Sequence, residues 1–130
     1  MEGMRAFFER DRLAHELGIE LVSAGEGTAT TRLVLGPRHL NSAGAAHGGA
    51  IFALADAAFS VASNSRGAPA AAIDAHINYF KGVSEGALTA EAREESFHPK
   101  IASYAIVVTD ERGDKVAVFQ GLVYRKVERR

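Results

Sequence analysis

The pattern of apolar and polar positions is organised around one long, almost wholly apolar segment. Residues 47–64 are rich in alanine, include Ile51, Phe52 and Leu54, and contain a single carboxylate. A helix that is apolar on most of its surface needs other structure to cover it. The pattern therefore predicts a central helix over residues 47–64, with the rest of the chain wrapped around it.

On both sides of this segment, alternation of apolar and polar residues indicates β-strands. The alternation is clearest over residues 72–80, where apolar and polar side chains take opposite faces. The apolar face holds Ile73, Ala75, Ile77 and Tyr79, and the polar face holds Asp74, His76 and Asn78. The expected strands are residues 19–24, 28–35, 72–80, 87–97, 101–109 and 115–125.

The remaining segments complete an α+β order of elements. Residues 4–17 are amphipathic and stop at Gly18, so they predict a short N-terminal helix. Residues 36–46 contain glycine, proline and asparagine and predict a loop. The whole order indicates an antiparallel sheet of five to six strands wrapped around one long central helix, in a single domain over residues 1–130.

Composition narrows the range of partners. The chain has 130 residues, and 47% of them are hydrophobic, which is enough for one core. Its formal net charge is −1, so no overall field favours nucleic acid or an anionic membrane. It has no cysteine, which excludes disulfides and thiolate metal sites. Its charged N-terminus is unlike a signal peptide and its apolar runs are short, so we expect a cytoplasmic protein.

The candidate chemistry begins where the central helix begins, at His47-Gly48-Gly49. A helix N-terminus offers unpaired backbone N–H groups and a partial positive charge, and glycine lets a ligand approach them closely. Gly48 and Gly49 are therefore expected to present donors to a carbonyl oxygen or oxyanion, as acyl transfer requires. Metal binding by His47 is not expected, because no second ligand stands at metal-ligand spacing.

Asp56 is the single carboxylate of the helix, and a buried carboxylate is costly unless it has a partner or a task. The positions three and four residues later are Phe59 and Ser60, so they supply no cation. Asp56 is therefore a candidate general base, or a nucleophile that forms an anhydride.

The spacing of the two candidate groups points to two copies of the chain. Gly48 and Asp56 are eight residues apart, which is about 12 Å along a helix axis. A reacting carbonyl needs its donor and its base each at about 3 Å, so one chain does not easily supply both. A two-fold axis that sets two such helices antiparallel would bring Gly48 of one subunit to Asp56 of the other.

The same residues carry a resemblance to a known family. Asn41-x-x-Gly44-x-x-His47-Gly48-Gly49, then Asp56, then Asn64-Ser65-Arg66-Gly67, resembles the hotdog-fold acyl-CoA thioesterases, in particular their phenylacetate-pathway branch. Strand segments of that family are similar to Ile77-Asn78-Tyr79-Phe80-Lys81 and Val118-Phe119-Gln120-Gly121. The resemblance covers nearly the whole chain.

The resemblance implies a hotdog fold and hydrolysis of small or aromatic acyl-CoA esters to the free acid and CoA. It implies that the Gly48 N–H polarises the thioester carbonyl and that Asp56 of the neighbouring subunit acts as base or nucleophile. It implies that His47 and Asn41 shape the loop and support the oxyanion site. The family forms homodimers, usually paired into homotetramers, and uses no metal or cofactor.

Further substrate-binding residues are expected around these groups. Because CoA carries phosphates, cations should lie near the mouth of the site, and the candidates by position are Arg66, Lys81, Lys100 and Arg125. Phe80, with Phe52 and Phe59, is a candidate lining for the acyl group. The chain departs from the family at two places. Arg10 stands where some members have an Asn that contributes to the site, and Ala71 and Ala72 stand near the place where some branches have a Ser or Thr.

Three other functions stay open. A hotdog protein could bind acyl-CoA without hydrolysing it, although the carboxylate argues against that. A hotdog enoyl-CoA hydratase would pair His47 with Asp56, but these positions lie about 180° apart around one helix. A purely structural oligomer gives no reason for Asp56. The strand face with Asp74, His76 and Asn78 is more simply a solvated or subunit-facing surface than a metal cluster.

Overall fold

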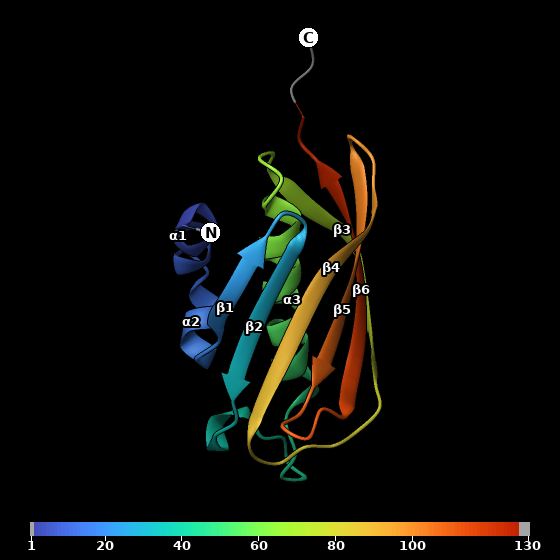
Figure 1. Ribbon diagram of the computed structural model, residues 1–130. Coiled ribbons are helices and arrows are strands. Elements are labelled where there is room, and N and C mark those ends of the chain that lie inside the picture. The colour runs from blue at the N-terminus through green and yellow to red at the C-terminus, as the bar shows by residue number, and fades with distance from the viewer. Residues whose placement is uncertain (1, 128–130) are drawn as a thin grey trace.

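One antiparallel sheet curls around a central helix in the computed structural model, which describes residues 2–127. The strand order across the sheet is β1-β2-β4-β5-β6-β3, and helix α3 lies in its concave side (Figure 1). The strands are β1 (Glu20–Gly25), β2 (Thr28–Val34), β3 (Ala70–Tyr79), β4 (Ala87–Phe97), β5 (Ile101–Thr109) and β6 (Lys115–Arg125). The helices are α1 (Glu2–Glu9), α2 (Arg12–Leu17), α3 (Gly48–Asn64) and the short 3-10 turn η1 (Pro37–His39).

This arrangement confirms the expected hotdog architecture of a six-stranded antiparallel sheet around a long helix. The last three strands have the predicted bounds, and the others differ by at most two residues at either end. The central helix also agrees, except that His47 precedes it as the N-cap residue. The amphipathic and alternating patterns were sufficient here because each segment has one clearly apolar side.

The prediction of a single N-terminal helix over residues 4–17 was wrong. The first helix ends at Glu9, and a second helix begins at Arg12. Asp11 has an extended backbone and its Oδ1 accepts a hydrogen bond from Ala14 N–H at 3.0 Å. An aspartate at such a position caps a new helix more effectively than it continues an old one. Gly18 ends α2 in the left-handed conformation, as expected.

The core lies between α3 and the concave face of the sheet. Phe59 of α3 packs against Tyr104 and Phe119, with ring centroids 5.9 and 5.5 Å apart respectively. Gly121 lies beneath the Phe59 ring, where a Cβ atom would stand 2.6 Å from Cε1 of Phe59. The missing side chain at Gly121 is therefore what lets the aromatic ring lie against the sheet.

Part of the concave side is left uncovered, and it includes one stripe of α3. The stripe consists of the incompletely buried residues Gly49, Phe52, Ala53, Asp56 and Ser60, whose spacing puts them on one side of the helix.

Strand β3 continues this uncovered area. It pairs only with β6, and its concave face bears Ala75, Ile77 and Tyr79, opposite Gly121, Phe119 and Ala117 of β6. Tyr79 is 48% exposed and the following Phe80 is 62% exposed. We call this area, formed by the α3 stripe and the concave face of β3, the α3–β3 surface.

The close approach at Gly121 can be tested by substitution. Gly121→Ala should lower the free energy of unfolding by about 1–3 kcal/mol, because the added methyl group overpacks the core against Phe59. The cost should be smaller in a Phe59→Leu background, which a double-mutant cycle from urea unfolding would measure. Gly82→Ala is the matched control, since no atom lies within 4 Å of the position that a Cβ would take there. Equal costs at the two glycines would contradict the packing argument.

Candidate active site

The first turn of α3 leaves one backbone donor unpaired. His47 caps the helix, and its Nδ1 accepts a hydrogen bond from Gly49 N–H at 2.8 Å. The His47 carbonyl accepts from Ala50 and Ile51 N–H at 2.9 and 3.1 Å. Within residues 2–127, the N–H of Gly48 has no such acceptor. Of the two glycine donors expected from the sequence, the structure leaves only that of Gly48 available, because the His47 side chain occupies the other.

Tyr79 holds this turn against the edge of the sheet. Its hydroxyl donates a hydrogen bond of 2.8 Å to the Gly48 carbonyl, and a Cβ at Gly48 would lie 3.2 Å from the Tyr79 oxygen. Partial burial raises the pKa of the Tyr79 phenol, so it stays a donor. In the sequence, Tyr79 stands out only as an apolar strand residue within a family-like segment, and its contact with Gly48 depends on the three-dimensional fold.

The loop before the helix is shaped by Asn41. Its Oδ1 accepts hydrogen bonds from Ala43 and Ala45 N–H at 2.9 and 3.1 Å. Its own N–H donates to the Ala45 carbonyl at 2.7 Å. An asparagine that accepts from two following amides closes a tight loop through its side chain. Asn41 therefore supports the conformation of the loop that leads to the Gly48 donor.

A second histidine, His39, also holds this loop in place, although nothing in the sequence marked it as a site residue. His39 is buried, and its Nδ1 accepts from Gly36 N–H at 2.8 Å. Its Nε2 therefore carries the proton that is donated to the Leu17 carbonyl at 2.6 Å. The His39 carbonyl accepts the His47 N–H at 2.7 Å. The side chain and carbonyl of His39 thus join the end of α2, the loop and the helix start, and only the spacing of Gly36 and His39 could have indicated this from the sequence.

Asp56 lies in the middle of α3, half-buried beside a separate cavity. This cavity has a volume of about 110 Å³ and is lined by Asp56, Phe59, Ser60, Ser63, Asn64, Ala70, Ala72 and Val123. Burial raises the pKa of the Asp56 carboxyl, and the negative charge of Asp11 raises it further. Neither cause is a hydrogen bond or a cation, so the proton affinity of the carboxylate is above the ordinary value, and no side chain in the described part of the chain forms an ion pair or hydrogen bond with it.

The continuous helix keeps Gly48 and Asp56 apart within one chain. Helix α3 runs without a break over 17 residues. Eight residues of α-helix correspond to about 12 Å along its axis. The donor and the carboxylate of one copy therefore cannot contact the same carbonyl group, as the spacing in the sequence predicts.

Arg66 lies at the far end of α3 from Gly48 and is paired within the chain. Its guanidinium binds both carboxylate oxygens of Glu94, at 3.1 and 2.7 Å, and lies 3.3 Å from a Glu26 oxygen. The guanidinium holds the pKa of Glu94 below its ordinary value. Arg66 also packs on the ring of Phe97, whose centroid is 5.0 Å from its Cζ. These contacts account for the charge of Arg66 without a ligand.

Lys81 and Phe80 follow Tyr79 at the other end of the molecule. The Lys81 ammonium bridges Asp110 and Asp114 in the turn between β5 and β6, with the Asp114 oxygen at 2.8 Å. Phe80 projects into solvent next to this pair. The structure therefore brings Gly48, Tyr79 and Phe80 to one end of the molecule and places Asp56 about two turns farther along α3.

Two other features bear on the range of functions. Within the described residues, no group of three or more His, Asp or Glu side chains is placed to hold a metal ion. Asp74 and His76 lie on the convex face, beside a shallow depression that also includes Glu95 and Gln120. No helix between residues 2 and 127 is both long and apolar enough to cross a membrane.

Comparison with known proteins gives a consistent result. Residues 43–117 match the family model described as the thioesterase superfamily. The chain is 33% identical over 125 residues to the acyl-coenzyme A thioesterase PaaI of Escherichia coli, covering 95% of this chain and 89% of that protein.

Solved structures agree with this match. The E. coli PaaI protein from the phenylacetic acid degradation operon superposes with a TM-score of 0.91 at 32% identity, covering 95% of this chain and 90% of that chain. A mutant form of the phenylacetic acid degradation protein PaaI from Thermus thermophilus superposes with a TM-score of 0.85 at 36% identity, covering 88% of this chain and 99% of that chain.

The half-buried state of Asp56 predicts a pH-dependent stability. The pKa of Asp56 is higher in the folded protein than in the unfolded chain, so the folded protein binds this proton more tightly. The free energy of unfolding therefore falls as pH rises from 3.8, the ordinary pKa, through the raised pKa of the folded state. Asp56→Asn should therefore be more stable than wild type at pH 7, with a difference that shrinks as pH falls below that window. Urea unfolding at several pH values and one protein concentration would measure it. The exposed Asp74→Asn is the control, and an equal gain in both variants would contradict the argument.

Proposed function

The chain belongs to the thioesterase superfamily, and on that basis we propose that it hydrolyses acyl-CoA thioesters to the free acid and CoA. The observation that supports this proposal most directly is that one helix carries both an available backbone donor, the Gly48 N–H, and a half-buried carboxylate, Asp56. Both groups have the chemistry that thioester hydrolysis requires, a donor for the developing oxyanion and a base or nucleophile.

The donor side of the reaction uses the start of α3. The thioester oxygen accepts the Gly48 N–H, and the partial positive charge of the helix N-terminus stabilises the oxyanion as it forms. His47, Asn41 and Tyr79 keep this turn in place, so that the donor needs no rearrangement when the substrate arrives. Gly49 contributes by closing the cap with His47 and by leaving room for the substrate.

Asp56 supplies the second function. As a general base it takes a proton from the attacking water, and as a nucleophile it forms a mixed anhydride that water then cleaves. A raised pKa makes the Asp56 carboxylate a stronger base than an exposed aspartate. The thiolate of CoA leaves in either case.

Two copies of the chain are needed to assemble each site. The α3–β3 surface exposes apolar side chains and the unpaired edge of β3, and Asp56 lies within it. A second copy related by a two-fold axis would cover this surface and set the two α3 helices antiparallel. The Gly48 donor of one copy then faces the Asp56 carboxylate of the other, and the dimer holds two sites. We propose this homodimer, paired further into a homotetramer, as the active form in the cytoplasm.

The acyl group is proposed to be small or aromatic, of the phenylacetyl type. Support comes from the similarity to PaaI proteins of phenylacetic acid degradation and from the small size of the cavity beside Asp56. Phe80 is proposed to contact the substrate at the Gly48 end. Arg66 and Lys81 can contribute to CoA binding only if a phosphate shares or displaces their present carboxylate partners.

The remaining alternatives are less well supported. For a hydratase, His47 and Asp56 would have to act as a pair, yet the Nδ1 of His47 is used in the helix cap. For a non-catalytic CoA-binding protein, an unpartnered half-buried carboxylate has no role. A turnover assay with phenylacetyl-CoA, hydroxyphenylacetyl-CoA and aliphatic CoA esters separates hydrolysis from binding alone.

The role of the Gly48 donor predicts a sharp difference between two substitutions. Gly48→Pro removes the N–H, and proline suits the first position of a helix after His47, whose ψ is 135°. Gly48→Ala keeps the N–H and adds the same Cβ next to Tyr79. We expect Gly48→Pro to lower kcat by about 10²–10³-fold more than Gly48→Ala does. Equal kcat values for the two folded variants would count against the donor role.

The shared site predicts complementation between inactive subunits. Asp56→Asn and Gly48→Pro should each lack activity alone, but a randomly mixed dimer population should regain about a quarter of the wild-type sites. The measurement is turnover of an acyl-CoA ester after subunit exchange, confirmed by mass spectrometry of tagged chains. A mixture of Asp56→Asn with itself in two tagged forms is the control. Absence of recovery despite exchange would exclude the two-subunit site.

A further inference from the structure

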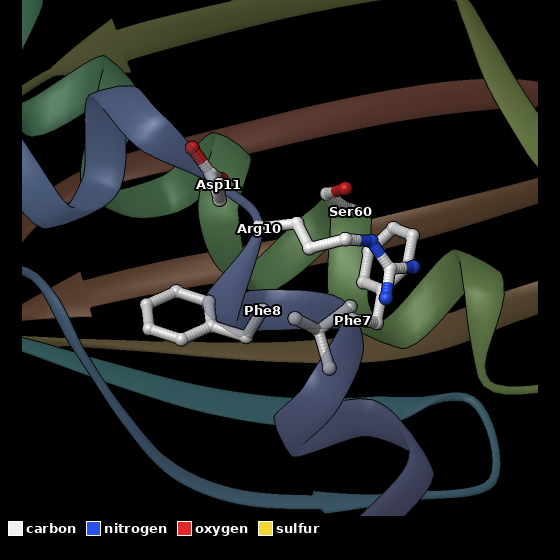
Figure 2. Close-up of a pocket in the computed structure, with 6 residues that line it drawn as sticks. Phe7, Phe8, Arg10, Asp11 and Ser60 are labelled. Carbon is white, nitrogen blue, oxygen red and sulfur yellow. The ribbon is translucent and has the colours of Figure 1, made fainter.

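A second cavity lies next to the one beside Asp56, where the N-terminal helices meet α3. It has a volume of about 240 Å³ and is lined by Phe7, Phe8, Arg10, Asp11, Ser60 and Val61. Figure 2 shows the side chains of Arg10 and Asp11 diverging from the junction of α1 and α2, with Arg10 on the Phe7 side. The break between α1 and α2 is what places these two residues at the cavity.

The charge of Arg10 is not neutralised by the chain. Its guanidinium makes a hydrogen bond of 3.4 Å to the Ala6 carbonyl and lies 5.9 Å from the centroid of the Phe7 ring. Among the side chains of residues 3–127, no carboxylate forms an ion pair with it. The neighbouring Asp11 points toward the start of α2, where it caps Ala14 N–H. Arg10 thus differs from Arg66, whose charge is already paired within the chain.

The two cavities are neighbours, because Ser60 lines both. Ser60 lies one helical turn, about 6 Å along the axis, from Asp56. An acyl group whose thioester carbonyl lies at Asp56 would therefore extend past Ser60 toward the cavity that Arg10 lines. The walls along that path combine apolar rings with a hydroxyl group, which suits a short chain that ends in a polar group.

We propose that Arg10 is a specificity-determining residue that, among short unbranched acyl groups, favours those bearing a terminal carboxylate over those without one. This inference rests on the proposed function. The guanidinium would bind the carboxylate through charge-assisted hydrogen bonds, for which its planar fork is well suited. The phosphates of CoA are the other anionic groups of the substrate, but they lie beyond the sulfur, on the opposite side of the thioester from the acyl chain.

The test compares two acyl groups of the same length on two carriers. The glutaryl and pentanoyl groups differ only in the terminal carboxylate, and each is compared as a thioester of CoA and of N-acetylcysteamine, a short carrier that lacks the nucleotide and all the phosphates of CoA. Arg10→Gln should lower the ratio of kcat/KM for glutaryl to that for pentanoyl esters about tenfold or more on both carriers, because one charged hydrogen-bond partner is lost. Arg5→Gln, a substitution of an exposed α1 residue outside the cavity, is the control and should leave the ratio unchanged.

Each other outcome overturns the inference in an identifiable way. An unchanged ratio in Arg10→Gln means that Arg10 does not contact the acyl terminus. If Arg10→Gln lowers kcat/KM for both CoA esters and leaves it unchanged for both N-acetylcysteamine esters, Arg10 binds a phosphate of CoA instead. Hydrolysis of pentanoyl esters without the expected ratio change leaves the proposed thioesterase function intact. Failure of wild type to hydrolyse any of the four esters overturns the inference, and the proposed thioesterase function falls with it only if phenylacetyl-CoA is not hydrolysed in the same assay either.

Discussion

The fold depends on removing the apolar surface of one helix, α3, from contact with water. Helix α3 buries most of its surface against the concave side of the sheet, and α1 and α2 lie beside it at the β1 edge (Figure 1). Because β3 is an edge strand, the cover is incomplete along the stripe that contains Asp56. The same helix is rigid over its 17 residues, so the positions of the Gly48 donor and the Asp56 carboxylate are set by one backbone. Helix α3 therefore both forms the centre of the core and carries the two groups of the proposed site.

The donor end of that helix is fixed by polar contacts, in contrast to the apolar packing along its length. His39, His47, Asn41 and Tyr79 each satisfy a backbone group of the loop or the first turn. Together they occupy the neighbouring donors and acceptors and leave the Gly48 N–H for an external acceptor. A backbone donor held in this way stabilises charge without the reorganisation that a flexible side chain would need.

Much of this arrangement could be predicted from the sequence, because its signals were local. Alternation over β4 to β6 and the apolar run of α3 gave element bounds, and the eight-residue spacing from Gly48 to Asp56 gave their separation. The break at Asp11 was missed because capping by a side chain competed with a continuous amphipathic pattern.

Three contacts could not be predicted from the sequence for a different reason: His39 with Leu17, Tyr79 with Gly48, and Arg66 with Glu94. Each joins residues at least 22 positions apart, which only the fold brings together. The hydroxyl of Tyr79 also links the edge strand β3 to the start of α3 by a hydrogen bond to the Gly48 carbonyl. Phenylalanine at that position would keep the ring and remove this polar link. A single oxygen atom thus provides the hydrogen bond that anchors the first turn of the helix to the outermost strand of the sheet.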